Sequence, residues 1–157
     1  MHTHEELIRK FYTAFQQLDY RGMQSCYHDE VTFSDPVFQS LKGNEARAMW
    51  QMLIIASTDL IIQFDSVEAN NENGQCHWEA FYTFSRTGRK VHNRIEASFK
   101  FKDGKIIEHI DQFDLWRWSR MALGISGVLL GWTPIVRNKI RKMARYNLDK
   151  FISSAGI

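Results

Sequence analysis

The sequence predicts an α+β fold: a cone-shaped, curved and mainly antiparallel sheet with three N-terminal helices on its concave face, followed by a C-terminal helical extension. Through most of residues 1–57, apolar side chains recur at spacings of three and four, as in amphipathic helices. From about residue 60 to residue 115 the pattern changes to the alternation of strands. Helices followed by a run of strands indicate helices packed on one face of an antiparallel sheet. The 157 residues are enough for one domain with a substantial core.

The first helix is expected over residues 3–18, where Thr3 and Glu6 have the spacing of a capping box. Its apolar face comprises Leu7, Ile8, Phe11, Phe15 and Leu18, with Tyr12 beside it. Asp19 is placed to cap a second, short helix over residues 20–27.

A short alternating strand over residues 31–33 then leads into the Asp35-Pro36 corner. Because proline disfavours the helical region for the residue before it, Asp35 is expected to be extended. A third helix is expected over residues 45–57. Its apolar residues include Ala46, Met49, Trp50 and Leu53.

The remaining strands are expected over residues 60–67, 75–85, 91–102 and 106–115. Tight turns are expected at Thr87-Gly88-Arg89 and at Lys102-Asp103-Gly104-Lys105. In the strand at 91–102, alternation places on one face Val91, Asn93, Ile95, Ala97, Phe99 and Phe101. In the last strand it places together Ile107, His109, Asp111 and Phe113. Asp114 can cap a following helix over residues 115–123.

The C-terminal part of the chain is electrostatically distinct. Residues 115–157 contain eight basic side chains and one acid, a net charge of +7, which leaves −5 for the rest of a chain whose total is +2. We therefore expect a domain at residues 1–124 and a basic amphipathic extension at residues 125–157 that packs on it.

Pro134 is placed to start a helix that runs to residue 152. Its expected apolar face is Ile140, Met143, Ala144, Leu148 and Phe151, with the basic residues on the opposite, solvated face. The alternatives are a lid over a pocket, a dimer element, or a helix lying on an anionic membrane surface.

Composition favours a cytoplasmic protein without a metal or cofactor. The first residues are polar and acidic, no apolar run is long enough to span a membrane, and Cys26 and Cys76 are isolated, as in reduced proteins. His2, His4 and His28 lack the spacing of metal ligands. No aromatic platform or nucleic-acid motif accompanies the basic extension, so nucleic acid is not an expected partner.

Asp35 is the side chain that most suggests chemistry, because its neighbours in the sequence include Phe33, Val37 and Phe38. Apolar surroundings disfavour the charged carboxylate, which suits a general base that works near neutral pH. Asp before Pro is also common in turns, where the carboxylate caps its own backbone, and both roles remain open. His109 and Asp111 form either a second part of an acid/base cluster or a structural ion pair.

Four segments resemble a known family: Asp-Tyr-Arg-Gly-Met (19–23), Tyr-His-Asp-Glu-Val-Thr-Phe-Ser-Asp-Pro-Val (27–37), Phe-Lys-Asp-Gly-Lys-Ile-Ile-Glu-His (101–109) and Phe-Asp-Leu-Trp with Ala-Leu-Gly (113–124). They are similar to the nuclear transport factor 2-like superfamily, which includes ketosteroid isomerases, SnoaL-like polyketide cyclases and limonene-epoxide hydrolases. The resemblance covers about residues 4–124. It implies a small-molecule pocket between the helices and the sheet.

The resemblance to the isomerases is partial. The Asp that serves as their general base falls on Asp35, but their two oxyanion donors fall on Phe11 and near Ala97, whose side chains cannot donate a hydrogen bond. The resemblance therefore implies negligible 3-oxosteroid isomerase activity.

The cyclases match better, because they use a His and an Asp on late strands, where this chain has His109 and Asp111. Arg94 and Glu96 resemble part of the Asp-Arg-Asp relay of the epoxide hydrolases, but alternation turns both away from Ala97.

We therefore expect a pocket with acid/base residues Asp35, His109 and Asp111 and with walls formed by Tyr12, Phe33, Trp50, Trp78, Tyr82, Asn93, Ala97 and Phe113. The predicted function is a cofactor-independent isomerase or cyclase that uses aspartate general acid/base chemistry on a small apolar carbonyl compound. The alternatives are a binding module for a lipid-like or polyketide-like ligand, and a dimerisation domain. A homodimer is expected through the outer face of the sheet, where we place His92, Arg94, Glu96 and Trp116.

Overall fold

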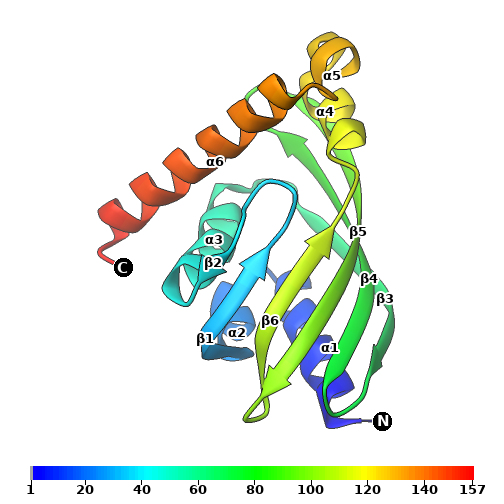
Figure 1. The fold of residues 1–157 in the computed structure, drawn as a ribbon, viewed down its shortest axis with the longest axis vertical. Coiled ribbons are helices and arrows are strands. Elements are labelled where there is room, and N and C mark those ends of the chain that lie inside the picture. The colour runs from blue at the N-terminus through cyan, green and yellow to red at the C-terminus, as the bar shows by residue number, and fades with distance from the viewer. Residues whose placement is uncertain (1) are drawn as a thin grey trace.

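A computed structural model describes residues 2–157, and it confirms the predicted α+β fold (Figure 1). Its elements are α1 (Thr3–Gln16), α2 (Tyr20–Ser25), β1 (Tyr27–Ser34), β2 (Leu41–Lys42), α3 (Asn44–Ala56), β3 (Ile61–Ala69), β4 (Asn73–Phe84), β5 (Arg89–Lys102), β6 (Lys105–Gln112), α4 (Leu115–Leu123), α5 (Ile125–Leu130) and α6 (Pro134–Ala155).

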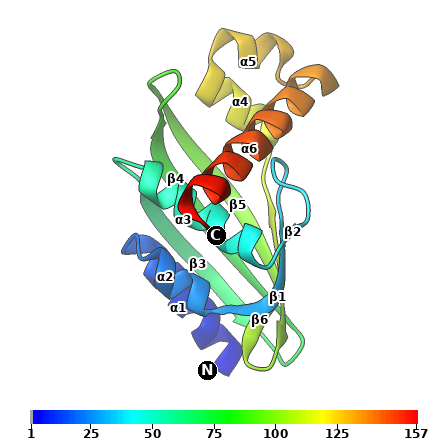
Figure 2. The same ribbon diagram turned by 90° about the vertical axis from the view of Figure 1, so that its left-hand side faces the viewer.

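The strands form one six-stranded sheet in the order β2-β1-β6-β5-β4-β3. β1 runs parallel to β6, whereas the other neighbouring pairs are antiparallel. Helices α1, α2 and α3 lie together on one face of this curved sheet (Figure 2). α1 packs across β3 and β4, and α3 packs against β1 and β2. The core therefore lies between these helices and the concave face.

Some element ends differ from the expectations. His2 caps α1 through its side chain, which accepts a hydrogen bond from the backbone of His4, so Thr3 lies inside the first turn and the expected capping box is wrong. α2 ends at Ser25, and Tyr27 therefore begins a strand rather than ending a helix. Leu53, expected among the apolar contacts of α3, is largely exposed. The caps expected at Asp19 on α2 and at Asp114 on α4 are present.

The turn between β5 and β6 fixes their starting register. Asp103 and Gly104 both have positive φ, at 53° and 72°, as a two-residue hairpin turn requires. The turn places Phe101 opposite Ile106, and the pairing then shifts by one residue. Ile107 is the extra residue of this β-bulge. Ile106 is fully buried while Ile107 is only partly so, which corrects the expectation that Ile107 faces the core.

The bulge decides which polar residues of β6 face the core. Beyond it, His109 lies opposite Phe99, and Asp111 lies opposite Ala97. All four residues are buried. Because side chains alternate across a strand, the same chain without the extra residue would turn His109 and Asp111 to the outer face.

α6 packs on α3 and runs across the helical side of the sheet (Figure 2). Leu148 is fully buried in the core. Two basic residues that were expected in solvent contact the domain instead. The Arg141 Nε donates to the carbonyl of Pro36 at 2.9 Å, and Arg145 forms an ion pair with Glu45. No helix within residues 2–157 combines the length and the apolar content needed to cross a bilayer.

The outer face of the sheet carries a network of charged side chains. Glu79 contacts His77 at 2.9 Å and His92 at 2.5 Å, and Glu96 contacts His77 at 2.5 Å. Arg94 lies 3.6 Å from Glu79. The expectation that Arg94 and Glu96 face away from Ala97 agrees with this arrangement. Pairing of this face with a second copy stays a prediction.

We predict that Leu148→Ala lowers the free energy of unfolding by about 2–5 kcal/mol, because it removes a fully buried side chain from the contact between α6 and the core. Urea unfolding measures this change. The matched control is Ile135→Ala on the same helix, where the side chain is 81% exposed and little change is expected. Equal stability of the two variants would show that α6 does not pack as described.

Candidate active site

Asp35 lies where β1 ends, and its carboxyl group has two distinct oxygens. Oδ1 accepts hydrogen bonds from the backbone N–H groups of Val37 and Phe38, at 2.7 and 2.6 Å. The Asp35 N–H donates to the Phe38 carbonyl at 2.8 Å, which closes the corner. Oδ2 makes no hydrogen bond within residues 2–157. The turn role expected for an Asp-Pro corner is therefore filled by one oxygen, and the other remains available to a ligand.

The surroundings of Asp35 raise its pKa. Burial disfavours the charged form and raises the pKa of this carboxyl from 3.8 to about 7. The two backbone N–H donors oppose the shift, while the negative charge of Asp111 adds to it. A group with this pKa can both accept and donate a proton near neutral pH.

A chain of hydrogen bonds runs through the core to Asp111. The Trp50 Nε1–H donates to the Tyr27 hydroxyl at 2.8 Å, and this hydroxyl lies 2.7 Å from Nδ1 of His109. Nε2 of His109 lies 2.8 Å from Oδ1 of Asp111. The Trp78 Nε1–H donates to the same oxygen at 3.2 Å. Tyr27, His109, Trp50, Trp78 and Asp111 are all buried.

The donors fix the positions of the protons in this chain. An indole nitrogen can only donate, so the Tyr27 oxygen accepts from Trp50 and its own hydrogen is free to point at Nδ1 of His109. Burial raises the pKa of Tyr27 well above its usual value, which keeps that hydrogen in place. Nδ1 of His109 then accepts this hydrogen, and its Nε2–H donates to Asp111. The alternative, with a proton on Nδ1, would leave the Tyr27 hydrogen buried without a partner.

Asp35 and Asp111 line one open pocket of about 300 Å³ at the end of β1 and β6. Its lining consists of Ser34, Asp35, Pro36, Ile110, Asp111, Gln112 and Phe113. His109 is fully buried behind Asp111 and does not reach this pocket. Two carboxyl groups with different surroundings therefore meet at one solvent-reachable site.

Most of the expected pocket walls lie in the core rather than around this opening. Tyr12, Phe33, Trp50, Trp78, Asn93 and Ala97 are buried in the structure. Rings fill the middle of the cone: His109 is stacked on Trp50, with 5.9 Å between ring centroids, and Tyr12 stacks on Phe64 at 5.5 Å. Of the expected walls, Phe113 lines the open pocket.

Two tyrosine hydroxyls in this region differ in their partners. The Tyr82 hydroxyl accepts from the Trp118 Nε1–H at 2.7 Å. Burial raises the pKa of Tyr82, and the charge of Asp35 adds to this shift. The Tyr12 hydroxyl is buried and has no hydrogen-bond partner among residues 2–157. A bound molecule could satisfy this hydroxyl.

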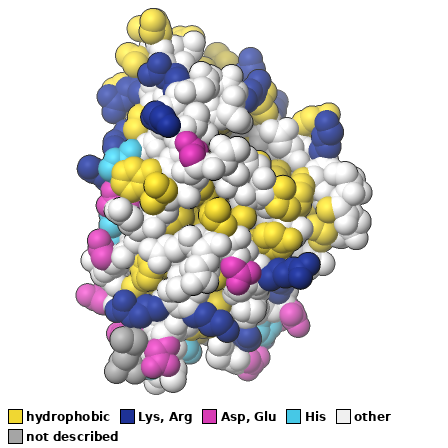
Figure 3. Space-filling view, turned by 180° about the vertical axis from the view of Figure 1, so that it is seen from behind, with side chains coloured by type: hydrophobic (Ala, Val, Ile, Leu, Met, Phe, Trp, Pro, Cys, Tyr) yellow, Lys and Arg dark blue, Asp and Glu magenta, His cyan; other side chains and the backbone are white. Residues whose placement is uncertain are grey.

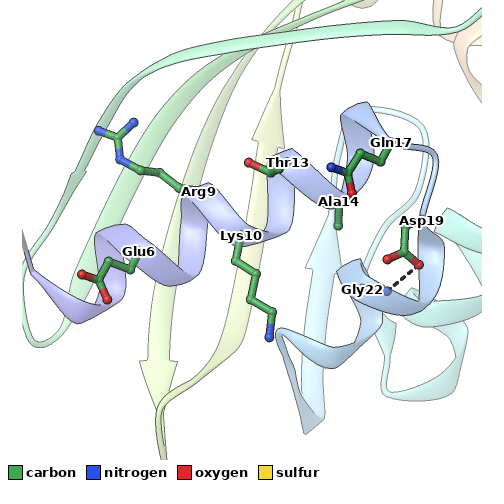
Figure 4. Close-up of a pocket in the computed structure, with 8 residues that line it drawn as sticks. All are labelled: Glu6, Arg9, Lys10, Thr13, Ala14, Gln17, Asp19 and Gly22. Atoms are coloured by element: carbon green, nitrogen blue, oxygen red, sulfur yellow. Dashed lines mark hydrogen bonds between the residues drawn. The ribbon is translucent and has the colours of Figure 1, made fainter.

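A second, larger hollow of about 460 Å³ lies on the surface between α1 and α2 (Figure 4). Its lining consists of Glu6, Arg9, Lys10, Thr13, Ala14, Gln17, Asp19 and Gly22. Their side chains point in different directions, and the hydrogen bond drawn there is the cap of α2, in which the Gly22 N–H donates to the Asp19 carboxylate. Nothing in this hollow converges on a reacting atom. Nor does any group of three His, Cys, Asp or Glu side chains in residues 2–157 have the placement of a metal site.

The expectations from sequence missed Tyr27 as part of the site. Tyr27 stands directly before the first stretch in which acidic and apolar residues alternate, and this position could have indicated its role. It was missed because residues 20–27 were expected to form a helix. Ser34, Pro36, Ile110 and Gln112 were missed as lining residues, although each is next to an expected site residue in the sequence.

The model of the SnoaL-like domain family matches residues 8–109, and the chain belongs to this family. The match ends within β6, so α4, α5 and α6 lie outside it. No curated protein matches the chain.

Solved structures share the fold at low sequence identity. An NTF2-like protein of unknown function from Burkholderia pseudomallei is 16% identical, with a TM-score of 0.67 over 77% of this chain and 98% of that one. A proposed polyketide cyclase from Xanthomonas campestris is 18% identical, with a TM-score of 0.62 over 74% and 93%. An LEH-like epoxide hydrolase from M. tuberculosis is 16% identical, with a TM-score of 0.57 over 83% and 92%.

We predict that Asp35→Asn changes the dependence of stability on pH. Because the folded pKa of about 7 exceeds the usual 3.8, the protonated group stabilises the fold fully below pH ~4, and this contribution is lost as the pH rises through about 7. Between pH ~4 and pH about 7, the free energy of unfolding of the wild-type protein should therefore fall by about 2–4 kcal/mol relative to that of the variant. The lower figure allows for water that reaches the partly buried carboxyl group. Urea unfolding across this range measures the difference, and parallel curves would contradict it.

We predict that Tyr27→Phe lowers the free energy of unfolding by about 1–3 kcal/mol, because the Trp50 N–H and Nδ1 of His109 both lose their partner in a buried site. In ¹⁵N NMR spectra, the Nδ1 signal of His109 should move as its hydrogen bond is lost. Tyr20→Phe is the control, since that hydroxyl makes no hydrogen bond in the described residues. An unchanged Nδ1 signal would mean that the proton order given above is wrong.

Proposed function

We propose that this protein is a cofactor-independent isomerase or cyclase in which Asp35 moves a proton on a small apolar carbonyl compound. One observation carries the proposal: Asp35, with its pKa raised to about 7, shares an open pocket with Asp111. Pairs of carboxyl groups in unlike surroundings are a recurrent basis of acid/base catalysis. Membership of the SnoaL-like family, with a proposed polyketide cyclase among its structural neighbours, supports the same reaction class.

In the proposed reaction, ionised Asp35 takes a proton from the carbon next to a carbonyl group. The C–H bond breaks, an O–H bond forms on Asp35, and the electron pair moves toward the carbonyl oxygen. Asp35 then returns the proton to a different carbon. Alternatively, the new carbon nucleophile attacks a second carbonyl carbon of the same molecule and closes a ring, the C=O π bond breaks, and Asp35 returns its proton to the resulting alkoxide oxygen. Atoms and electrons balance in either outcome without an oxidant or a metal. The free Oδ2 of Asp35 is the atom to which we assign the proton.

The other polar residues have positioning roles in this proposal. Asp111 raises the pKa of Asp35 by its charge, and His109 with Trp78 hold that carboxylate through two N–H groups. Tyr27 keeps His109 in the required tautomer. His109 itself does not reach the pocket, so we assign it no direct contact with substrate.

The pocket favours a small or flat substrate. Its volume of about 300 Å³ is at the lower end for small-molecule sites, and Pro36, Ile110 and Phe113 provide apolar surface. A structural neighbour, TerC, was crystallised with polyporic acid, which supports a cyclic carbonyl compound as the ligand class. A larger ligand would have to displace rings from the filled interior.

A second function is a binding module without turnover, and a specific observation favours it. By the resemblance to the isomerases, their two donors fall on Phe11 and near Ala97. Both residues are buried, and neither side chain offers a hydrogen bond to an oxyanion. Loss of one such donor lowers rates by roughly 10²–10³. The same absence makes 3-oxosteroid isomerisation an unsuitable reaction for this site.

Deuterium exchange tests the proposal without knowledge of the natural substrate. We predict that the protein accelerates exchange of the protons next to the carbonyl of 2-tetralone in D₂O, and that kcat/KM rises with pH through about 7 as Asp35 ionises. Asp35→Asn should lower the rate by roughly 10²–10⁴. Asp111→Asn should move the midpoint to lower pH, because the charge that raises the pKa of Asp35 is gone.

Asp19→Asn is the matched control, since asparagine also caps a helix and this residue is remote from the Asp35 pocket. Exchange at the buffer rate, with 2-tetralone nevertheless shifting the NMR signals of Ile110 and Phe113, would replace the enzyme proposal with the binding module. Exchange that is unchanged in Asp35→Asn would remove Asp35 from the reaction.

A further inference from the structure

Six large apolar side chains are exposed at one end of the molecule, in α5, in the link that follows it and in the first turn of α6. We call them the apolar tip, and their exposed fractions are Ile125 79%, Val128 49%, Leu129 63%, Leu130 52%, Trp132 63% and Ile135 81%. They occur within eleven consecutive residues, so they form one patch rather than scattered surface residues. Contiguous exposed apolar patches mark interaction surfaces.

The packing of α5 on α4 forces these side chains outward. A Cβ atom at Gly127 would lie 1.9 Å from the carbonyl oxygen of Ser119, and one at Gly131 would lie 2.7 Å from the Cβ of Ser119. Only glycine can occupy such positions without moving the backbone. Because glycines lie against α4 at this contact, the large side chains of α5 point away from α4 and remain exposed.

Positive charge surrounds the apolar tip. From Leu115 to Leu148 the chain has seven basic residues and no acid. Figure 3 shows Lys and Arg side chains around the hydrophobic ones at the end that carries α4 and α5, whereas acidic side chains lie mostly toward the other end. The tip is therefore apolar at its centre and cationic at its edge.

The positive charge continues along the exposed side of α6. Ile135, Lys139, Lys142 and Tyr146 are exposed and recur at spacings of three and four, so they share one face of the helix. This face is not the one that packs on the core, which contains Leu148. Docking through it would leave the contact between α6 and α3 intact.

We propose that the apolar tip docks the protein on the surface of an anionic lipid bilayer. The apolar side chains would enter the boundary between head groups and acyl chains, where Trp132 suits the aromatic preference of that region. Lys139 and Lys142 would contact the anionic head groups, and each such residue strengthens binding by roughly fivefold. A second copy of the chain is a poorer occupant, because two tips would bring their positive edges together. The proposal is independent of the chemistry at Asp35.

Vesicle flotation of the intact chain tests this docking. We expect binding to vesicles of equal parts phosphatidylglycerol and phosphatidylcholine, weak binding to phosphatidylcholine alone, and release at high salt. Leu129→Ser with Trp132→Ser should weaken binding by roughly a hundredfold or more, because two exposed side chains lose their apolar contact with lipid. Ile55→Ser with Ile61→Ser removes two equally exposed apolar residues elsewhere, at 57% and 59%, and should leave binding unchanged.

The charge contribution has its own matched pair of variants. Lys139→Gln with Lys142→Gln should weaken binding by roughly tenfold or more. Lys100→Gln with Lys102→Gln makes the same change in net charge on β5 and should have little effect. Circular dichroism and melting curves establish that all four variants fold.

Three outcomes would overturn the proposal. The first is equal binding to neutral and anionic vesicles, and the second is binding that survives loss of Leu129 and Trp132. The third is light scattering that shows a dimer which Leu129→Ser with Trp132→Ser dissociates, since a second copy would then cover the tip.

Discussion

The β-bulge at Ile107 determines the chemical character of the protein interior. By adding one residue to β6 after the hairpin turn, it brings His109 and Asp111 to the concave face, opposite Phe99 and Ala97. A carboxylate and an imidazole inside an aromatic core are costly unless every polar atom has a partner. The hydrogen-bonded chain through the core is the consequence of that requirement.

Two of the aromatic residues that fill the cone also donate hydrogen bonds to its polar atoms. Trp50 and Trp78 are nearly or fully buried, and each donates its indole N–H into the polar chain that ends at Asp111. A pair of smaller residues would open a cavity but leave Tyr27 and Asp111 with fewer donors. The interior is therefore closed, and the carboxyl groups are reached from the edge of the sheet, beside Asp35.

Most features that depend on neighbouring residues could be predicted from the sequence, whereas the β-bulge and the part played by Tyr27 could not. The caps at Asp19 and Asp114 and the corner at Asp35 follow from spacings of two or three residues. The bulge at Ile107 has no local signature, because strict alternation and its interruption look alike in a run of mixed apolar and polar residues. Tyr27 reaches the site only through the parallel pairing of β1 with β6, which joins distant parts of the chain.

That parallel pairing also has a consequence for how the chain folds. The Ile106 N–H donates to the Cys26 carbonyl at 2.9 Å, and Tyr27 meets His109 across 82 residues of sequence. Contacts of such long separation require loop closure before they contribute any stability, and they slow folding. We therefore expect β6 to pair with β5 through its short turn before β1 pairs with β6. On this expectation Tyr27 and His109 meet late, after the antiparallel strands have formed.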